Sequence, residues 1–345
     1  MSLLQPESFD LAKKPETIGP DNFRMLFLDL DFMILAPPDY QRPALVATKV
    51  RTLNAILGHI ASKTGTSFGV ALCTQKPVGA FSSPEIGPIY APLLNINSQI
   101  LKPENIVSPT PLFAAFGEFG TTMLTPTATG WKKHINPQFL GLHADSQTLI
   151  DLLHRLDYIS PTGDPAPGFP YRLEPFNDFN VSLQLPDGSP MLGTEKETIA
   201  EKIKQFLKKT GNAKLLKQFQ ITTDHNDVDI IPALIDRMTK LIGVQAITTL
   251  MHSQGFPWFS PKYICIADDK AHAADQATQA VLKAGGQAII PANADPALQL
   301  TAGHFFPIGI TSNHNVFIGL LDGLTRHFLH QPLTESNISL NLLLN

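Results

Sequence analysis

Short apolar runs alternate with an amphipathic helical pattern in the N-terminal part of the chain. Met25–Leu28 and Phe68–Cys73 are apolar, as expected for strands that are covered on both faces of a sheet. The segment between them has apolar residues at helical spacing and ends before Gly65; these residues are Val46, Val50, Leu53, Leu57 and Ile60. A strand, a helix and a strand in this order predict a βαβ unit, and therefore a parallel sheet.

The same alternation returns in the C-terminal part. Strands are expected at Tyr263–Ile266 and Gln287–Ile290, with a helix at Ala273–Ala284 between them that stops at two glycines. A further edge strand at 305–310 and a final helix at 316–328 follow. Both ends of the chain thus indicate one α/β fold, a Rossmann-like core built on a parallel sheet.

The middle of the chain has a different character. Pro, Ser, Thr and Gly are frequent up to about residue 170. An alternating strand at 177–185, a helix from Thr194 and two strands within 215–232 are expected beyond it. We therefore predict an inserted α+β unit, a discontinuous core and two tails: 81–232, 20–80 with 233–332, and 1–19 with 333–345.

The composition argues against some classes of partner. The chain has 345 residues and a formal net charge of −4 at pH 7, so no basic surface for nucleic acid is expected. No apolar stretch is long enough to cross a bilayer, and the polar start does not resemble a secretory signal. We therefore expect no membrane partner and a cytoplasmic location. The two cysteines lie in apolar runs and are expected to be buried, reduced residues.

Two carboxylates, Asp29 and Asp31, follow the first predicted strand. Ligands bind at the carboxyl ends of the strands in open parallel sheets, and side chains two residues apart in an extended chain point to the same side. Like charges this close need a cation or a shared proton. The pair is therefore a candidate for a Mg²⁺ site, or for a carboxylate nucleophile beside a general acid and base.

A second acidic pair, Asp268 and Asp269, follows the strand expected at Tyr263–Ile266. If both strands are central in one sheet, these carboxylates converge with Asp29 on one cation. Capping of the next helix is the competing interpretation. Both can hold at once.

Two further polar residues fit such a site. Thr74 ends the second predicted strand, where its hydroxyl can donate to a phosphate oxygen or cap a turn. Lys240 lies where the α/β pattern resumes, and its ammonium can neutralise charge between carboxylate and phosphate or remain on the surface. The sequence alone leaves both alternatives open for each residue.

Four features of the chain resemble, in this order, the four motifs of the haloacid dehalogenase superfamily. They are the motif from Asp29 to Asp31, then Thr74, then Lys240, and then the pair Asp268 and Asp269. The insert resembles the type-II cap of the branch with sucrose-phosphate phosphatase and mannosyl-3-phosphoglycerate phosphatase. The resemblance implies a Mg²⁺-dependent phosphatase in which Asp29 is the nucleophile, Asp31 is the general acid and base, and Thr74 and Lys240 position the phosphoryl group. The implied metal ligands are Asp29, Asp31, Asp268 and Asp269.

The implied substrate is a small phosphorylated metabolite such as a sugar phosphate, and the long segment 80–170 keeps a phosphoprotein open. Two other functions stay open. Phe32 and Met33 stand where the family has Gly-Thr, which favours a catalytically weak or inactive binding or regulatory protein on the same scaffold. A glycosyltransferase that uses Asp29 and Asp31 with Mn²⁺ ranks third, because it leaves the second acidic pair unexplained.

Overall fold

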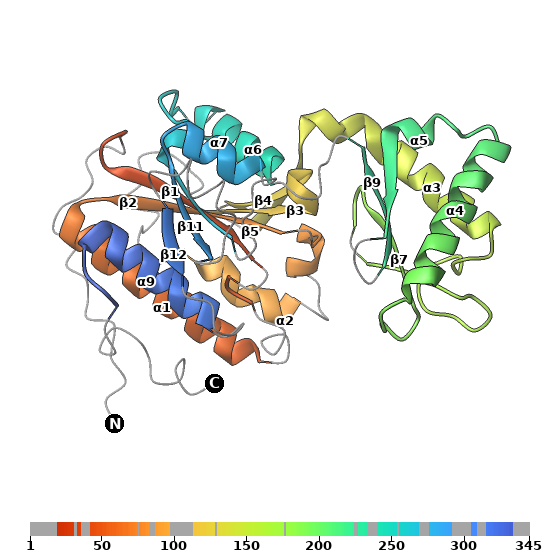
Figure 1. The fold of residues 1–345 in the computed structure, drawn as a ribbon, viewed down its shortest axis with the longest axis horizontal. Helices are drawn as coiled ribbons and strands as arrows, with labels where there is room; N and C mark the ends of the chain where they lie inside the picture. The colour runs from red at the N-terminus through yellow and green to blue at the C-terminus, as the bar shows by residue number, and fades with distance from the viewer. Residues whose placement is uncertain are drawn as a thin grey trace.

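The computed structural model describes most of the chain, and its described ranges are 19–30, 33–35, 42–74, 76–82, 87–96, 113–127, 130–175, 177–223, 227–233, 240–253, 255–268, 276–291, 305–308 and 315–333. Two sheets divide these residues into a large unit and a small unit, each defined by its own sheet and the helices packed on it (Figure 1). The large unit is formed from two parts of the chain that flank the small unit in sequence.

The large unit contains an eight-stranded sheet, five helices and several short 3₁₀ turns. Its elements are β1 (Phe23–Asp29), α1 (Pro43–Thr64), β2 (Ser67–Cys73), η2 (Val78–Ser82), α2 (Gly87–Tyr90), η3 (Ala91–Asn95), β3 (Phe113–Gly117), η5 (Glu118–Gly120), β4 (Thr122–Thr127), β5 (Gly130–Ile135), α6 (Leu241–Ser253), η7 (Pro261–Tyr263), β10 (Ile264–Ala267), α7 (Gln276–Lys283), β11 (Gln287–Pro291), β12 (Phe305–Ile308) and α9 (Asn315–Leu329). These counts refer to the described ranges alone.

The strand order of the large sheet is β12-β11-β10-β1-β2-β3-β4-β5. Neighbouring strands from β12 to β3 are parallel, whereas β4 and β5 are antiparallel. The N-terminal and C-terminal parts of the large unit therefore meet in the middle of the sheet, where β1 lies between β10 and β2. The predicted α/β fold with a parallel core sheet is confirmed.

Helices cover both faces of this sheet, which explains why its central strands are apolar throughout. In Figure 1, α1 and α9 lie on one face and α6 and α7 lie on the other. Every residue of β2 is buried, and so are five of the seven residues of β1. Among the described residues, none of the helices has both the length and the hydrophobicity that crossing a membrane requires.

The small unit consists of a four-stranded antiparallel sheet with helices on it (Figure 1, yellow to green). Its strand order is β6-β7-β9-β8, and it has its own apolar core. Its elements are η6 (Pro137–Leu142), α3 (His143–Arg155), β6 (Arg172–Leu173), β7 (Val181–Gln184), α4 (Gly193–Lys209), α5 (Leu215–Gln218), β8 (Phe219–Thr222) and β9 (Val228–Pro232). This is the α+β unit that the sequence pattern predicted in the second half of the insert.

The start of the predicted insert is corrected by the sheet. Strands β3, β4 and β5, which lie within 113–135, extend the large sheet, so the insert does not begin at residue 81. The backbone of β3 continues the parallel ladder from β2, and β4 and β5 add a hairpin at the far edge. The small unit therefore begins after Ile135, and we retain Pro232 as its proposed end.

Candidate active site

Three neighbouring strands of the large sheet end at one edge, each next to a candidate residue. The register pairs Asp29 with Cys73 on β2 and Leu28 with Ala267 on β10. Thr74 and Asp268 are the next residues after those two strands. Because the three strands are parallel, their carboxyl ends lie side by side, as the sequence predicted.

Lys240 contacts the acidic residues at the ends of β1 and β10. Its Nζ lies 2.6 Å from Oδ2 of Asp29 and 2.7 Å from Oδ2 of Asp268, to which it donates a hydrogen bond. The three side chains are largely buried, with exposed fractions of 15% for Lys240, 13% for Asp29 and 8% for Asp268. One cation thus lies between two carboxylates that come from separate parts of the chain.

The ammonium of Lys240 is held in its charged form. Burial by itself lowers the pKa of Lys240, but the carboxylates of Asp268 and Asp29 more than offset this effect and hold the pKa well above its usual value. Lys240 therefore keeps a full positive charge at the edge of the sheet throughout the physiological pH range.

The position of Lys240 depends on close packing at the start of α6. Lys240 directly precedes this helix, and its carbonyl accepts a hydrogen bond from Val244 N at 3.1 Å. Gly243 lies against the sheet: a Cβ there would come within 2.8 Å of the Phe27 ring and 3.2 Å of Cys73 Sγ. A side chain at this position would push the helix start, and Lys240 with it, away from the strand ends.

Thr74 shapes the loop after β2. It is buried, its backbone N donates to Phe116 O at 2.9 Å, and its hydroxyl accepts a hydrogen bond from Lys76 N at 3.1 Å. The turn-capping role considered for Thr74 is therefore present in the structure. Its place at the edge of the sheet leaves the phosphate-binding role as a proposal.

A buried lysine supports the chain beyond the first acidic pair. Lys49 on α1 donates a hydrogen bond to Ile34 O at 3.0 Å, and its ammonium lies 5.5 Å from the centre of the Phe317 ring. This contact fixes the short described segment 33–35, in which all residues are buried. The sequence carries no signal for this role, because a lysine in an amphipathic helix usually points to solvent.

Asp31 and Asp269 lie outside the described residues, so their predicted roles stay predictions. Asp29 and Asp268 supply two hard carboxylate oxygens at one point, which fits the ligand preference of Mg²⁺ in kind. Among the residues that the structure describes, no group of three or more His, Cys, Asp or Glu side chains is placed to hold a metal ion. The two remaining predicted ligands each lie within two residues of a described one in sequence.

The small unit faces the loop after β2 with an acidic side chain. Burial raises the pKa of Glu174, and the nearby carboxylates of Asp229 and Asp227 raise it further, whereas a hydrogen bond from Asn177 and the charge of Lys76 lower it. Glu174 lies between β6 and β7 in the small unit and Lys76 lies in the loop after β2, so charges of the two units influence each other beside the candidate site. Neither residue was identified from the sequence, because their proximity arises only from the packing of the two units.

No family model and no curated protein matches the chain. Solved structures do match, among them a haloacid dehalogenase-like hydrolase from Bacteroides thetaiotaomicron at 10% identity and a TM-score of 0.49, covering 89% of this chain and 100% of that one. A Thermotoga maritima protein matches at 11% identity and a TM-score of 0.46, with 87% and 96% covered. Plasmodium falciparum IMP-nucleotidase matches at 11% identity and a TM-score of 0.43, covering 72% of this chain and 54%, about half, of that one. At identities this low, these likenesses assign no role to any residue of this chain.

Proposed function

We propose that the protein is a Mg²⁺-dependent phosphomonoesterase of the haloacid dehalogenase superfamily that acts on a small phosphorylated metabolite. A sugar phosphate is the first class to test. The observation that carries the proposal is the contact of Lys240 Nζ with carboxylate oxygens of both Asp29 and Asp268 at the edge of a parallel sheet. Charge of both signs at such an edge suits a phosphate group, whose transfer depends mainly on alignment and electrostatics.

Asp29 is the proposed nucleophile. One of its carboxylate oxygens bonds to phosphorus while the ester O–P bond breaks, and the leaving oxygen takes a proton from Asp31. A water molecule then attacks phosphorus, Asp31 takes the proton of that water, and inorganic phosphate leaves as the carboxylate of Asp29 is restored. The rigid end of β1 favours this role, because a nucleophile on a central strand keeps its orientation.

Lys240 and Thr74 are proposed to position the phosphoryl group. The ammonium of Lys240 reduces the repulsion between the carboxylate of Asp29 and an incoming anionic phosphate. The hydroxyl of Thr74 lies at the end of the adjacent strand, from which it can donate to a phosphoryl oxygen.

Asp29, Asp31, Asp268 and Asp269 would hold the metal. When bound, Mg²⁺ neutralises negative charge on the phosphoryl oxygens. The described pair, Asp29 and Asp268, already shares one cationic partner, so both carboxylates are oriented toward a common point.

Turnover of para-nitrophenyl phosphate and a panel of sugar phosphates tests the proposal. The full chain is assayed with MgCl₂, with EDTA, and as an Asp29→Asn variant. We expect phosphate release that requires Mg²⁺ and disappears in the variant. A folded wild-type protein that shows no metal-dependent turnover of any of these esters would contradict the proposal and favour a binding or regulatory role.

A further inference from the structure

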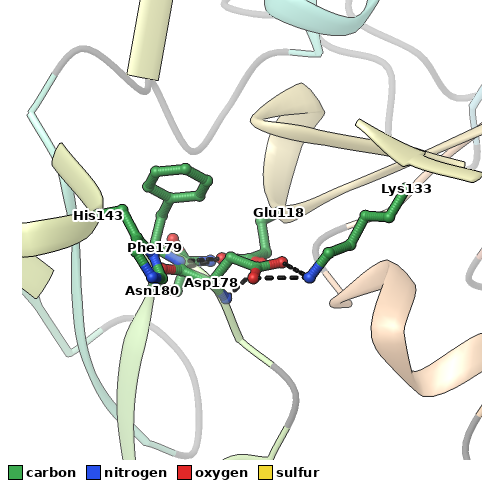
Figure 2. A network of polar contacts seen from close by, with 6 residues as sticks. All are labelled: Glu118, Lys133, His143, Asp178, Phe179 and Asn180. Atoms are coloured by element: carbon green, nitrogen blue, oxygen red, sulfur yellow. Dashed lines mark hydrogen bonds and ion pairs between the residues drawn. The ribbon is translucent and has the colours of Figure 1, made fainter. Parts of the chain in front are cut away.

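The carboxylate of Glu118 is enclosed by three consecutive backbone N–H groups from the small unit. Oε1 accepts from Asp178 N at 2.8 Å, and Oε2 accepts from Phe179 N at 2.9 Å and from Asn180 N at 2.9 Å (Figure 2). Glu118 is fully buried. Within the described part of the chain, these amides are the only hydrogen-bonding partners of the carboxylate, and none of them is a cation. A buried carboxylate held by neutral dipoles alone is rare enough to require an explanation.

The segment that supplies these amides is also held by Lys133, on β5 of the large unit, and by His143 and Ser146 of the small unit. Lys133 pairs with the carboxylate of Asp178 at 2.8 Å, and Nδ1 of His143 lies 3.1 Å from Asp178 O (Figure 2). Ser146 on α3 donates to Phe179 O at 3.1 Å, and the Phe179 ring is buried in a small apolar cluster. Residues 178–180 lead directly into β7 in the small sheet, so whatever holds these residues also holds that sheet.

The η5 turn, which begins with Glu118, contacts both the loop after β2 and the start of α6. The N–H of Glu118 donates to Lys76 O at 3.2 Å, in the loop that begins at Thr74. At the other end of η5, a Cβ on Gly120 would lie 2.7 Å from Gly243 N, at the start of the helix that follows Lys240. The η5 turn is therefore packed between the loop that carries Thr74 and the helix start that carries Lys240.

The conformation of Glu118 also indicates a constrained position. Its φ is 47°, in the left-handed region that residues with a side chain seldom occupy. Such a conformation persists where the surroundings fix it from several sides, and it occurs often at functional sites. Here the three amides, Lys76 and the packing of Gly120 supply those constraints.

We propose that Glu118 is a positioning residue, whose carboxylate fastens residues 178–180 of the small unit to the turn that supports Thr74 and Lys240. The contact sets the distance between the small sheet and the edge of the large sheet. The role goes beyond the proposed phosphatase chemistry, and only the kinetic part of its test rests on that function.

Hydrogen–deuterium exchange on the full chain tests the contact at constant pH 7.5. In the wild type, the amides of residues 178–180 should be strongly protected. Glu118→Ala leaves them without an acceptor, so their exchange should accelerate at least about 10-fold. Glu118→Gln retains an amide oxygen that can accept from part of the set and should give an intermediate rate. Glu201→Ala, at an exposed glutamate on α4, is the matched control and should leave the rates unchanged.

Steady-state kinetics with para-nitrophenyl phosphate and Mg²⁺ form the second part of the test. Glu118→Ala should lower kcat/KM about 10-fold, since the small unit is no longer held against the site, and Glu118→Gln should recover part of this loss. Rapid exchange at 178–180 in the wild type, or unchanged exchange in a folded Glu118 variant, would overturn the inference. So would faster exchange with kcat and KM equal to those of the wild type. A wild type without turnover refutes the proposed function instead, and the exchange rates then decide the inference.

Discussion

Two buried acidic sites in this molecule are stabilised in opposite ways. At the edge of the large sheet, Asp29 and Asp268 share the ammonium of Lys240 at 2.6 and 2.7 Å. At the junction of the two units, Glu118 has no cation among its described partners and accepts hydrogen bonds from three backbone N–H groups. The first site balances charge with charge, whereas the second places a charge among dipoles.

The difference sets which group responds to pH. The carboxylates around Lys240 hold the pKa of this lysine well above its usual value, so the charge at the sheet edge is constant. At Glu118, burial raises the pKa from 4.5 to about 7, despite the three N–H groups that lower it, and the charge of Asp178 adds to the increase. Lys240 therefore keeps its charge across neutral pH, whereas the carboxyl group of Glu118, which holds residues 178–180, titrates near neutral pH.

The largest expected effect comes from removing the proposed nucleophile. Asp29→Asn retains the shape of the side chain but not its charge, so kcat should fall by at least about 10³-fold while the protein stays folded. Phosphate release from para-nitrophenyl phosphate measures the loss, and circular dichroism monitors the fold. Asp21→Asn, at an exposed position just before the same strand, is the control and should keep wild-type activity. Equal activity in both variants would remove Asp29 from the mechanism.

Removing the shared cation should cost stability as well as activity. Lys240→Met leaves two nearly buried carboxylates facing each other, so the free energy of unfolding should fall by roughly 3–5 kcal/mol. Urea denaturation measures this change with and without Mg²⁺. A divalent ion can replace the missing positive charge, so Mg²⁺ should stabilise the variant more than it stabilises the wild type.

The control for that measurement is Lys283→Met, which removes an exposed lysine from α7. It should change stability by less than about 0.5 kcal/mol. If Lys240→Met is no less stable than this control, then the two carboxylates do not depend on the lysine.

Glu118→Gln should change how stability depends on pH. The folded-state pKa of about 7 lies above the ordinary value of 4.5, so the folded protein binds this proton more tightly than the unfolded chain does. The contribution of Glu118 to stability is therefore largest below pH 4.5 and declines as the pH rises through 7, by up to about 3 kcal/mol. The variant lacks this decline. The free energy of unfolding of the variant should therefore increase relative to that of the wild type between pH 5 and pH 8.

Other charged groups near Glu118 require a control in this titration. Asp178 lies beside the carboxyl group of Glu118, Lys133 on β5 and His143 on α3 contact Asp178, and Lys76 O accepts a hydrogen bond from Glu118 N. Ser146→Ala, which changes no titrating group at the same junction, should keep the wild-type dependence on pH. Parallel stability curves for the wild type and Glu118→Gln would show that the carboxyl group of Glu118 does not titrate in this range.

The smallest effect is expected at the rim of the same junction. The pair of Lys133 and Asp178 is accessible, with 43% of the lysine side chain exposed, so Lys133→Ala should cost less than about 1 kcal/mol of unfolding free energy. Urea denaturation in low and high salt measures this difference, which should shrink as salt increases. If Lys133→Ala lowers the free energy of unfolding as much as Lys240→Met does, then solvent exposure does not explain the difference in strength that we expect between the two ion pairs.

The sequence predicted the part of the fold that follows from buried parallel strands. Continuous apolar runs identified β1, β2 and β10, and their parallel arrangement explains why Asp29, Thr74 and Asp268 meet at one edge. Strands β3 to β5 were missed as part of the large sheet, because they lie in a stretch rich in Pro, Ser, Thr and Gly, and because β4 and β5 contain polar residues in place of a continuous apolar run. The role of Glu118 was not predictable either, since its partners lie about 60 residues away and are backbone amides, which carry no sequence signature.

The contact between Gly120 and Gly243 has a consequence for how this protein can vary. Two backbones meet there with no side chain between them, so the spacing of two functional parts is set by hydrogen atoms alone. A single methyl group added at Gly120 would separate η5 from α6 and would shift Lys240, which directly precedes α6. Mutational tolerance should therefore be low at two residues that take no part in the chemistry.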